Sequence, residues 1–171
     1  MSRQFVTEAV MLAIYGELLL TPVPVEYMIP YTSLLELYEF LSSDEALMSN
    51  AEDDKHVKEK VRELVDYLDE PLNKKKIQKA LNMPWAKSPY ILIGESTRIT
   101  VVNAMDTAPY GELFDPIETE LLLVSQREQT PLLTDQPELI HRIIDASVPV
   151  QVFDIDDFEF AVESDHFTHN I

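Results

Sequence analysis

Carboxylates are the most abundant side chains of this 171-residue chain that could act in catalysis or bind a metal. It carries 31 Asp and Glu residues against 13 Lys and Arg, with four His and no Cys. A sequence without Cys excludes disulfide frameworks, thiolate metal sites and cysteine nucleophiles. Glycine occurs only at positions 16, 94 and 111, which excludes the glycine-rich loops that cradle phosphates. Two carboxylates brought within ~4 Å repel by about 4 kcal/mol, so any acidic cluster needs a divalent cation or a shared proton.

The densest acidic run resembles a calcium loop only superficially. It consists of Asp154, Asp156, Asp157 and Glu159. A calcium loop of the EF-hand type needs Asx at its fifth position and Gly at its sixth, where this chain has Phe158 and Glu159. We therefore reject that motif. The alternation of apolar and acidic residues over 153–160 predicts an edge element with its charges turned to water.

The histidines add little further chemistry. His166 and His169 are spaced for a shared metal ion, but they fall in segment 164–171, where a frayed tail is the default expectation. His56 and His141 accompany no nucleophile motif, because G-x-S-x-G does not occur in the sequence.

Trp85, in NMPWAKSPY, is the one tryptophan and a candidate partner-binding residue. Two interpretations stay open. It is a core anchor or lid residue between two prolines, or it is an exposed aromatic anchor for a partner groove, because Trp is enriched in binding hot spots.

Charge is distributed unevenly along the chain, whose formal net charge is −18. Residues 101–171 hold fifteen acidic and two basic residues. The basic cluster of the sequence, Lys74, Lys75, Lys76 and Lys79, is expected to form the solvated face of a helix. We therefore expect a protein partner or a homo-oligomer, and no strong nucleic-acid binding.

The apolar stretch from Ala9 to Leu20 is too short for a membrane span, and Gly16 and Glu17 interrupt it. We expect no membrane association and no secretory signal. The expected location is the cytoplasm.

The elements that must position these side chains are predicted from periodicity and turn signals. In the first third, Ser2 is expected to cap a helix running through Phe5 to Ile14, and the proline-rich segment 21–31 is expected to form an edge strand or an extended connector. A second helix is expected over 34–41, followed by a mobile loop over 42–54.

The middle third predicts an amphipathic helix over 55–68, a shorter helix that begins at Pro71, and a hairpin with strands near 90–93 and 98–102. The last third predicts a helix over 116–128 that begins with a capping box at Asp115 and Glu118. Strand, helix and strand follow at 131–134, 137–144 and 149–155.

Together these elements predict a single α/β domain over 1–171, with a small, mostly parallel sheet, an antiparallel hairpin and about six flanking helices.

The order PYTSLLELYEF, ETELLLVSQREQTPLLTDQPELI, VPVQVFDI resembles a PIN domain. In that family an extended strand leads into a helix bearing an acid, and later an acid opens a helix that precedes a strand ending in Thr and Asp. The resemblance implies acids converging at the carboxyl ends of parallel strands, where they bind Mg²⁺ or Mn²⁺ for RNA cleavage. It assigns the metal-binding and catalytic positions to Glu36, Glu118 and Asp135. The family's first strand, which ends in Asp, has no counterpart, since Glu8 falls on the predicted first helix.

Each of these three acids also has a purely structural interpretation. Glu118 completes a capping box, Asp135 caps a helix, and Glu36 faces solvent on a helix. We therefore expect a non-enzymatic cytoplasmic interaction or regulatory protein on a degenerate PIN-like scaffold, without a cofactor. The alternative is a ribonuclease that uses Mg²⁺ or Mn²⁺ held by Glu36, Glu118 and Asp135.

Overall fold

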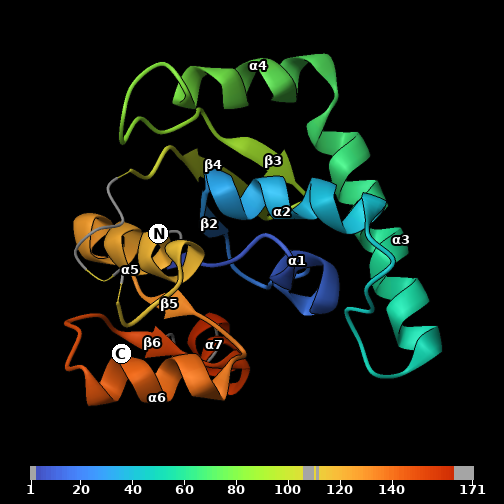
Figure 1. Cartoon of the computed structure of the whole chain (residues 1–171). Helices are drawn as coiled ribbons and strands as arrows, with labels where there is room; N and C mark the ends of the chain where they lie inside the picture. Colours follow the sequence, from blue (N-terminus) through green and yellow to red (C-terminus); the bar gives the residue numbers. More distant parts are fainter. Residues whose placement is uncertain (1–2, 106–109, 111, 164–171) are drawn as a thin grey trace.

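A six-stranded sheet forms the centre of the molecule (Figure 1), in a computed structural model that describes residues 3–105, 110 and 112–163. The strands are β1 (Arg3–Val6), β2 (Val25–Pro30), β3 (Ile91–Ile93), β4 (Thr97–Val102), β5 (Leu132–Leu133) and β6 (Val152–Phe153). Their order is β3-β4-β2-β1-β5-β6, and every neighbouring pair is parallel except β3 with β4. The predicted α/β class, with a mostly parallel sheet and an antiparallel hairpin, is confirmed.

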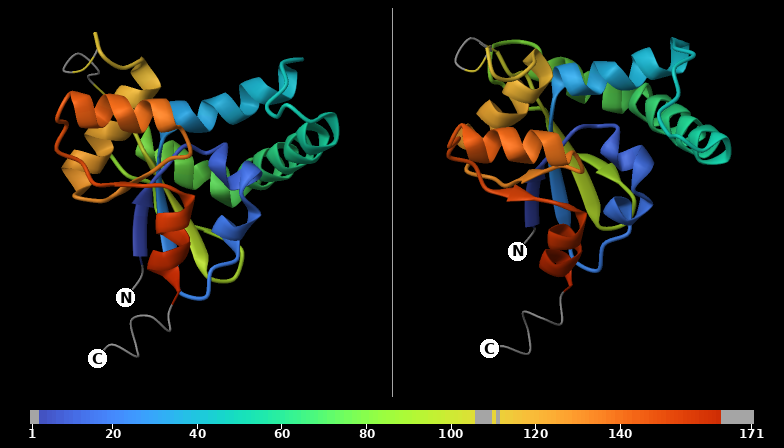
Figure 2. Two further views of the ribbon diagram at one scale, coloured as in Figure 1. Left: turned by 90° about the horizontal axis from the view of Figure 1, so that it is seen from below. Right: turned by 60° about the horizontal axis from the view of Figure 1, so that its bottom comes forward.

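Helices cover both faces of this sheet (Figures 1 and 2). They are α1 (Met11–Ile14), the 3-10 turn η1 (Gly16–Leu19), α2 (Tyr31–Ser42), α3 (Ala51–Leu68), α4 (Pro71–Ala80), α5 (Pro116–Glu128), α6 (Pro137–Asp145) and α7 (Ile155–Val162). Figure 2 shows α3 and the end of α2 reaching out beyond the sheet. No helix among the described residues is both long and apolar enough to cross a bilayer.

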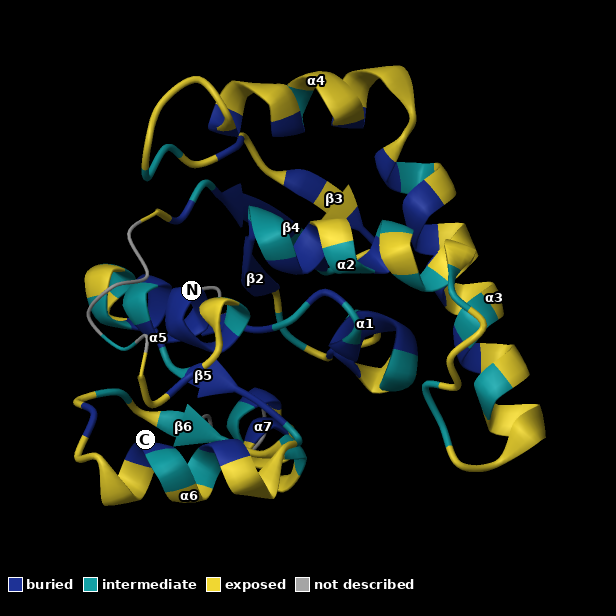
Figure 3. Ribbon diagram, in the orientation of Figure 1, coloured by how far each residue is buried: buried dark blue, intermediate teal, exposed yellow. Residues whose placement is uncertain are grey.

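The core divides into two layers because successive side chains of a strand point to opposite faces. Phe5, Tyr27 and Leu133 pack in one cluster with side chains of α1, α3 and α7. Val6 and Leu132 pack in the other with α5 and α6. Strands buried on both faces are typical of parallel sheets, and Figure 3 shows the central strands buried accordingly.

The first predicted helix is wrong at its start. Residues 3–6 form β1, which lies between β2 and β5. The Arg3 amide donates to Pro24 O at 3.0 Å and the Thr7 amide to Met28 O at 3.1 Å, so this backbone is satisfied by a neighbouring strand. A short apolar run fits a buried strand as well as a helix.

The edge position predicted for segment 21–31 is also wrong. β2 lies between β1 and β4, and all six of its residues are buried. Pro22 and Pro24 precede the strand and Pro30 is its last residue, so no proline removes a donor from its interior.

The edge element expected over 153–160 is wrong except at Phe153, which lies in the edge strand β6, because residues 155–160 belong to α7. Asp154 caps α7, and a capping box joins its side chain to the Asp157 amide while Asp157 accepts from the Asp154 amide. Phe158 is fully buried, with its ring centroid 5.0 Å from that of Phe5. The acids therefore begin a helix whose apolar face enters the core.

The loop expected over 42–54 is shorter, because α2 ends at Ser42 and Asn50 caps α3 through the amides of Glu52 and Asp53. The predicted tail 164–171, with His166 and His169, lies outside the described residues. The remaining helices and the hairpin occur where they were predicted.

The outer edge of the sheet at β3 is occupied by side chains from two helices. The Tyr67 hydroxyl of α3 donates to Leu92 O, and the Lys76 ammonium of α4 donates to Tyr90 O at 2.8 Å. Backbone acceptors along this edge strand are therefore used within the molecule, as protected sheet edges require.

Candidate functional site

The sheet has a topological switch point between β1 and β5. The chain runs from β1 to β2 on one side, and β5 later joins β1 on the other side. In open α/β sheets, ligands bind outside the carboxyl ends of the strands at such a point. Glu8 follows β1 by two residues and Asp135 follows β5 by two residues, so both acids lie at this edge.

Glu8 is the most perturbed acid of this edge. Burial raises its pKa to about 7, helped by the negative charges of Glu36, Asp135, Asp115 and Glu118. The Gln136 side-chain amide donates to Glu8 Oε1 at 3.3 Å. Four carboxylates from α2, the start of α5 and the end of β5 therefore act on one half-buried carboxyl. A perturbed acid at a switch point is typical of a functional site.

Asp135 is placed at the edge by a tyrosine. The Tyr15 hydroxyl, just after α1, donates to Asp135 Oδ2 at 2.7 Å. Burial and this hydrogen bond raise the pKa of Tyr15 to about 12. The helix cap predicted for Asp135 is wrong, because Gln136 occupies the cap position of α6 and makes no side-chain capping bond there.

Glu118 has the capping role that the sequence predicts and a second role that it does not. Its amide donates to Asp115 Oδ1 at 2.7 Å, and its Oε1 accepts from the Asp115 amide at 3.0 Å. Arg142 of α6 donates to Glu118 Oε1 at 2.8 Å and to Oε2 at 2.6 Å. The Arg142 hydrogen bonds lower the pKa of Glu118. The Glu118 carboxylate is thus already compensated by a bidentate cation.

Glu36 lies half-buried on α2, and not fully in solvent as the structural interpretation proposed. Burial raises its pKa, and Glu39 and Asp115 raise it further. Through its charge it acts on Glu8.

The acids that the resemblance selects thus share one edge of the sheet, but their arrangement fits a metal ion poorly. Within the part of the chain that the structure describes, no three His, Asp or Glu residues are grouped to hold a metal. Both oxygens of Glu118 are engaged by Arg142, whereas Mg²⁺ and Mn²⁺ require carboxylate oxygens that are open to them.

Glu8, Tyr15 and Arg142 are the residues of this edge that sequence reasoning missed. Glu8 was assigned to a helix, and a strand assignment for residues 3–6 would have placed it after a strand, where the family carries its first acid. Nothing in the local sequence pairs Arg142 with Glu118, 24 positions earlier.

Trp85 is half-buried and packs against the second core cluster. The Arg127 guanidinium lies 4.1 Å from its ring centroid, a cation–π contact. This placement agrees with a core anchor or lid residue more closely than with an exposed partner anchor. His56 and His141 are exposed, on α3 and α6.

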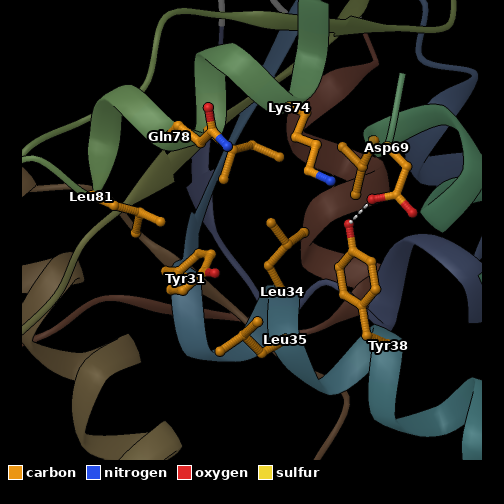
Figure 4. A pocket seen from close by; sticks show the side chains of 10 residues that line it. Tyr31, Leu34, Leu35, Tyr38, Asp69, Lys74, Gln78 and Leu81 are labelled. Atoms are coloured by element: carbon orange, nitrogen blue, oxygen red, sulfur yellow. Dashed lines mark hydrogen bonds between the residues drawn. The ribbon is translucent and has the colours of Figure 1, made fainter. Parts of the chain in front are cut away.

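A concave surface lies between α2 and α4 (Figure 4), with a cavity of about 300 Å³. We call it the α2–α4 groove. Its lining residues are Tyr31, Leu34, Leu35, Tyr38, Leu68, Asp69, Lys74, Ile77, Gln78 and Leu81. In Figure 4 the α4 side chains reach toward the tyrosines and leucines of α2, and the Tyr38 hydroxyl donates to Asp69 Oδ1 at 2.9 Å.

Comparison of the sequence with known proteins gives no family assignment: no protein-family model matches it, and neither does any curated protein.

Proposed function

We propose that this chain is a non-enzymatic interaction or regulatory protein of the cytoplasm, on a degenerate PIN-like scaffold, whose partner is another protein or a second copy. The observation that carries the proposal is the bidentate pairing of Arg142 with Glu118. In the resemblance, Glu118 is a metal ligand. Here an arginine supplies the positive charge that a metal would supply.

The state of Glu8 supports the same proposal. With a pKa of about 7, this carboxyl is protonated in a large share of molecules at neutral pH. Metal ligands must be deprotonated, so a proton on Glu8 competes with a cation. The charges of two acids at the edge are therefore compensated without a metal, in part by a proton on Glu8 and by Arg142 at Glu118.

The charge distribution also supports a role other than RNA cleavage. The net charge of −18 repels a polyanion, because nucleic-acid affinity depends on clustered Lys and Arg that release counterions. Glu36 and Asp135 place part of this negative charge at the edge where RNA would have to bind.

A Mn²⁺-dependent or Mg²⁺-dependent ribonuclease is the second candidate. It is favoured by the negative charges around Glu8, because the charges of Glu36 and Asp135 add to burial in raising the pKa of Glu8. A divalent cation would relieve this repulsion and would use hard oxygen ligands. In this alternative the cation would be held by Glu36 and Asp135, with Glu8 added and Glu118 freed from Arg142.

Thermal melts with and without millimolar Mn²⁺, together with an RNA cleavage assay, test the proposal. A cation that binds the native state at 100 times its Kd adds about 2.7 kcal/mol of stability. We expect no specific rise in Tm and no cleavage. A rise that disappears in the double variant Glu8→Gln, Asp135→Asn would overturn the proposal, as would Mn²⁺-dependent cleavage lost in that variant. The control is Glu59→Gln, an exposed acid of α3.

A further inference from the structure

We infer that the α2–α4 groove binds an acidic amphipathic segment of a partner protein. One apolar side chain of that segment enters the cavity, and its carboxylates lie on the lysines of α4. This inference rests on the proposed function and gives it a surface and a partner chemistry.

The groove is lined by apolar side chains, some of which remain partly exposed to solvent. Leu34 is buried at its base, whereas Leu35 and Leu81 are 39% and 38% exposed. Tyr31 and Tyr38, half-buried on α2, flank the leucines. Residues spaced three and four apart share one helix face, so Tyr31, Leu34, Leu35 and Tyr38 form one continuous wall of α2.

The positive charge along α4 indicates that the bound segment is negatively charged. Pro71–Ala80 contains four lysines and no acid, in a chain whose net charge is −18. Lys74 lines the groove, while Lys75 and Lys79 are exposed and four apart on the adjoining face. None of these three ammonium groups forms an ion pair with another described residue. Their charge is therefore available to carboxylates from outside the molecule.

Asp69 is the one carboxylate among the groove residues, and the Tyr38 hydroxyl binds it. A partner therefore meets an apolar wall on α2 and a basic rim on α4, with Asp69 as the one negative charge among the lining residues. The cavity of about 300 Å³ lies at the small end of ligand pockets, a size suited to one large side chain. An apolar anchor between carboxylates on a helix matches the helix-in-groove mode of recognition.

A defined peptide probes this surface on the intact protein. The probe is a fluorescent helical peptide with Leu and Phe along one face and Glu along the other. Two matched peptides carry Lys in place of Glu, or Ala in place of Leu and Phe. We expect the first peptide to bind, with an affinity that falls as salt rises, and both matched peptides to bind at least about tenfold more weakly.

Two variants place the binding in the groove. Lys74→Glu reverses a rim charge, and Leu35→Ser removes part of the exposed apolar wall. Each is expected to weaken binding of the acidic peptide about tenfold. Lys55→Glu, which makes the same charge change on an exposed position of α3, should leave the affinity within about twofold. Circular dichroism of each variant confirms that the fold is retained.

Several outcomes would overturn the inference. Equal binding of the acidic and basic peptides would remove the charge argument, and an unchanged affinity in both Lys74→Glu and Leu35→Ser would place binding elsewhere. Sedimentation of the protein alone is expected to show no self-association through this groove. Self-association abolished by Lys74→Glu would make a second copy the occupant. Displacement of the peptide by single-stranded RNA would make the groove a nucleic-acid site.

These readouts are independent of those that test the proposed function. The peptide and sedimentation experiments report on α2 and α4, whereas Mn²⁺ melts and RNA cleavage report on the carboxyl edge of the sheet. If the peptide does not bind the groove and Mn²⁺ has no effect, the inference about the groove is wrong and the proposed interaction role still stands. A Mn²⁺ effect overturns the role itself.

Discussion

Arg142 on α6 holds both carboxylate oxygens of Glu118 on α5, at 2.8 and 2.6 Å. The same arginine donates to Leu113 O at 3.2 Å. One side chain therefore ties α6 to the first turn of α5 and to the segment before it. The carboxylate that begins α5 is at once a cap and half of an ion pair.

This pair predicts a cost for removing either partner. Capping alone would tolerate Glu118→Gln, because glutamine can still bond to the cap amide. With Arg142 present, we expect Glu118→Gln and Arg142→Gln each to lower the free energy of unfolding by about 1–3 kcal/mol, and the double variant to lose less than the sum.

Urea melts of all three variants measure this coupling. Lys60 and Glu63 on α3 are the matched control, since their exposed ion pair at 3.3 Å should contribute no more than about 0.5 kcal/mol. Strict additivity at Glu118 and Arg142 would show that the pair has no energetic coupling.

Glu8 predicts a pH dependence with a definite sign. Its pKa is raised from 4.5 to about 7 in the native state, so the native state holds the proton after the unfolded chain has lost it. Stability is then fully present below about pH 4.5 and falls as the pH rises through about 7, by roughly 3 kcal/mol at most.

Glu8→Gln should therefore stabilise the protein at pH 8 and change little at pH 4. Urea melts across this range compare it with Glu59→Gln on the surface of α3, which should leave the slope unchanged. An identical pH profile for Glu8→Gln and the unmodified protein would contradict the burial of a carboxyl there.

Gly94, in the turn between β3 and β4, predicts a loss on substitution. Its φ is +73°, and an added Cβ would lie 2.9 Å from Leu19 O and 3.2 Å from Thr97 Oγ1. Gly94→Ala should lower stability by about 1–2 kcal/mol or more. Gly16 of η1 has nothing within 4 Å of an added Cβ, so Gly16→Ala should be neutral or slightly stabilising. Thermal melts of both variants measure the difference.

Two phenylalanines of α7 are expected to differ in how much stability their removal costs. Phe158 is 1% exposed and packs on Phe5 and Tyr27, whereas Phe160 is 59% exposed. Phe158→Ala should lower the free energy of unfolding by about 3–5 kcal/mol, and Phe160→Ala by far less. Similar losses in urea would contradict the helical assignment of 155–162.

Features fixed by neighbouring residues were predictable from the sequence. The capping box of Asp115 and Glu118, the amphipathic face of α3 and the glycine turn at Gly94 each depend on a few consecutive residues. Features fixed by distant partners were not. Residues 3–6 are a strand because β2 and β5 lie on either side, and α7 is a helix because Phe158 has a core to enter.

The candidate site was predictable only in part for the same reason. Glu36, Glu118 and Asp135 were selected through a resemblance. Their common edge follows from the parallel order of β2, β4 and β5, because each acid comes after one of these strands along the chain. Arg142 compensates Glu118 across 24 positions of the sequence, and the pKa of Glu8 is raised by burial and by the charges of acids that are distant in the sequence. No local pattern encodes such contacts.

The hydrogen bonds from Tyr67 to Leu92 O in β3 and from Lys76 to Tyr90 O just before it bear on how this protein would aggregate. A fibril grows by adding a strand to an open sheet edge. Here an added strand must first displace the Tyr67 hydroxyl of α3 and the Lys76 ammonium of α4. We therefore expect protection of this edge against fibril growth to depend on α3 and α4 more than on the strand itself. Conditions that detach α3 and α4 while the sheet survives would create the template for growth.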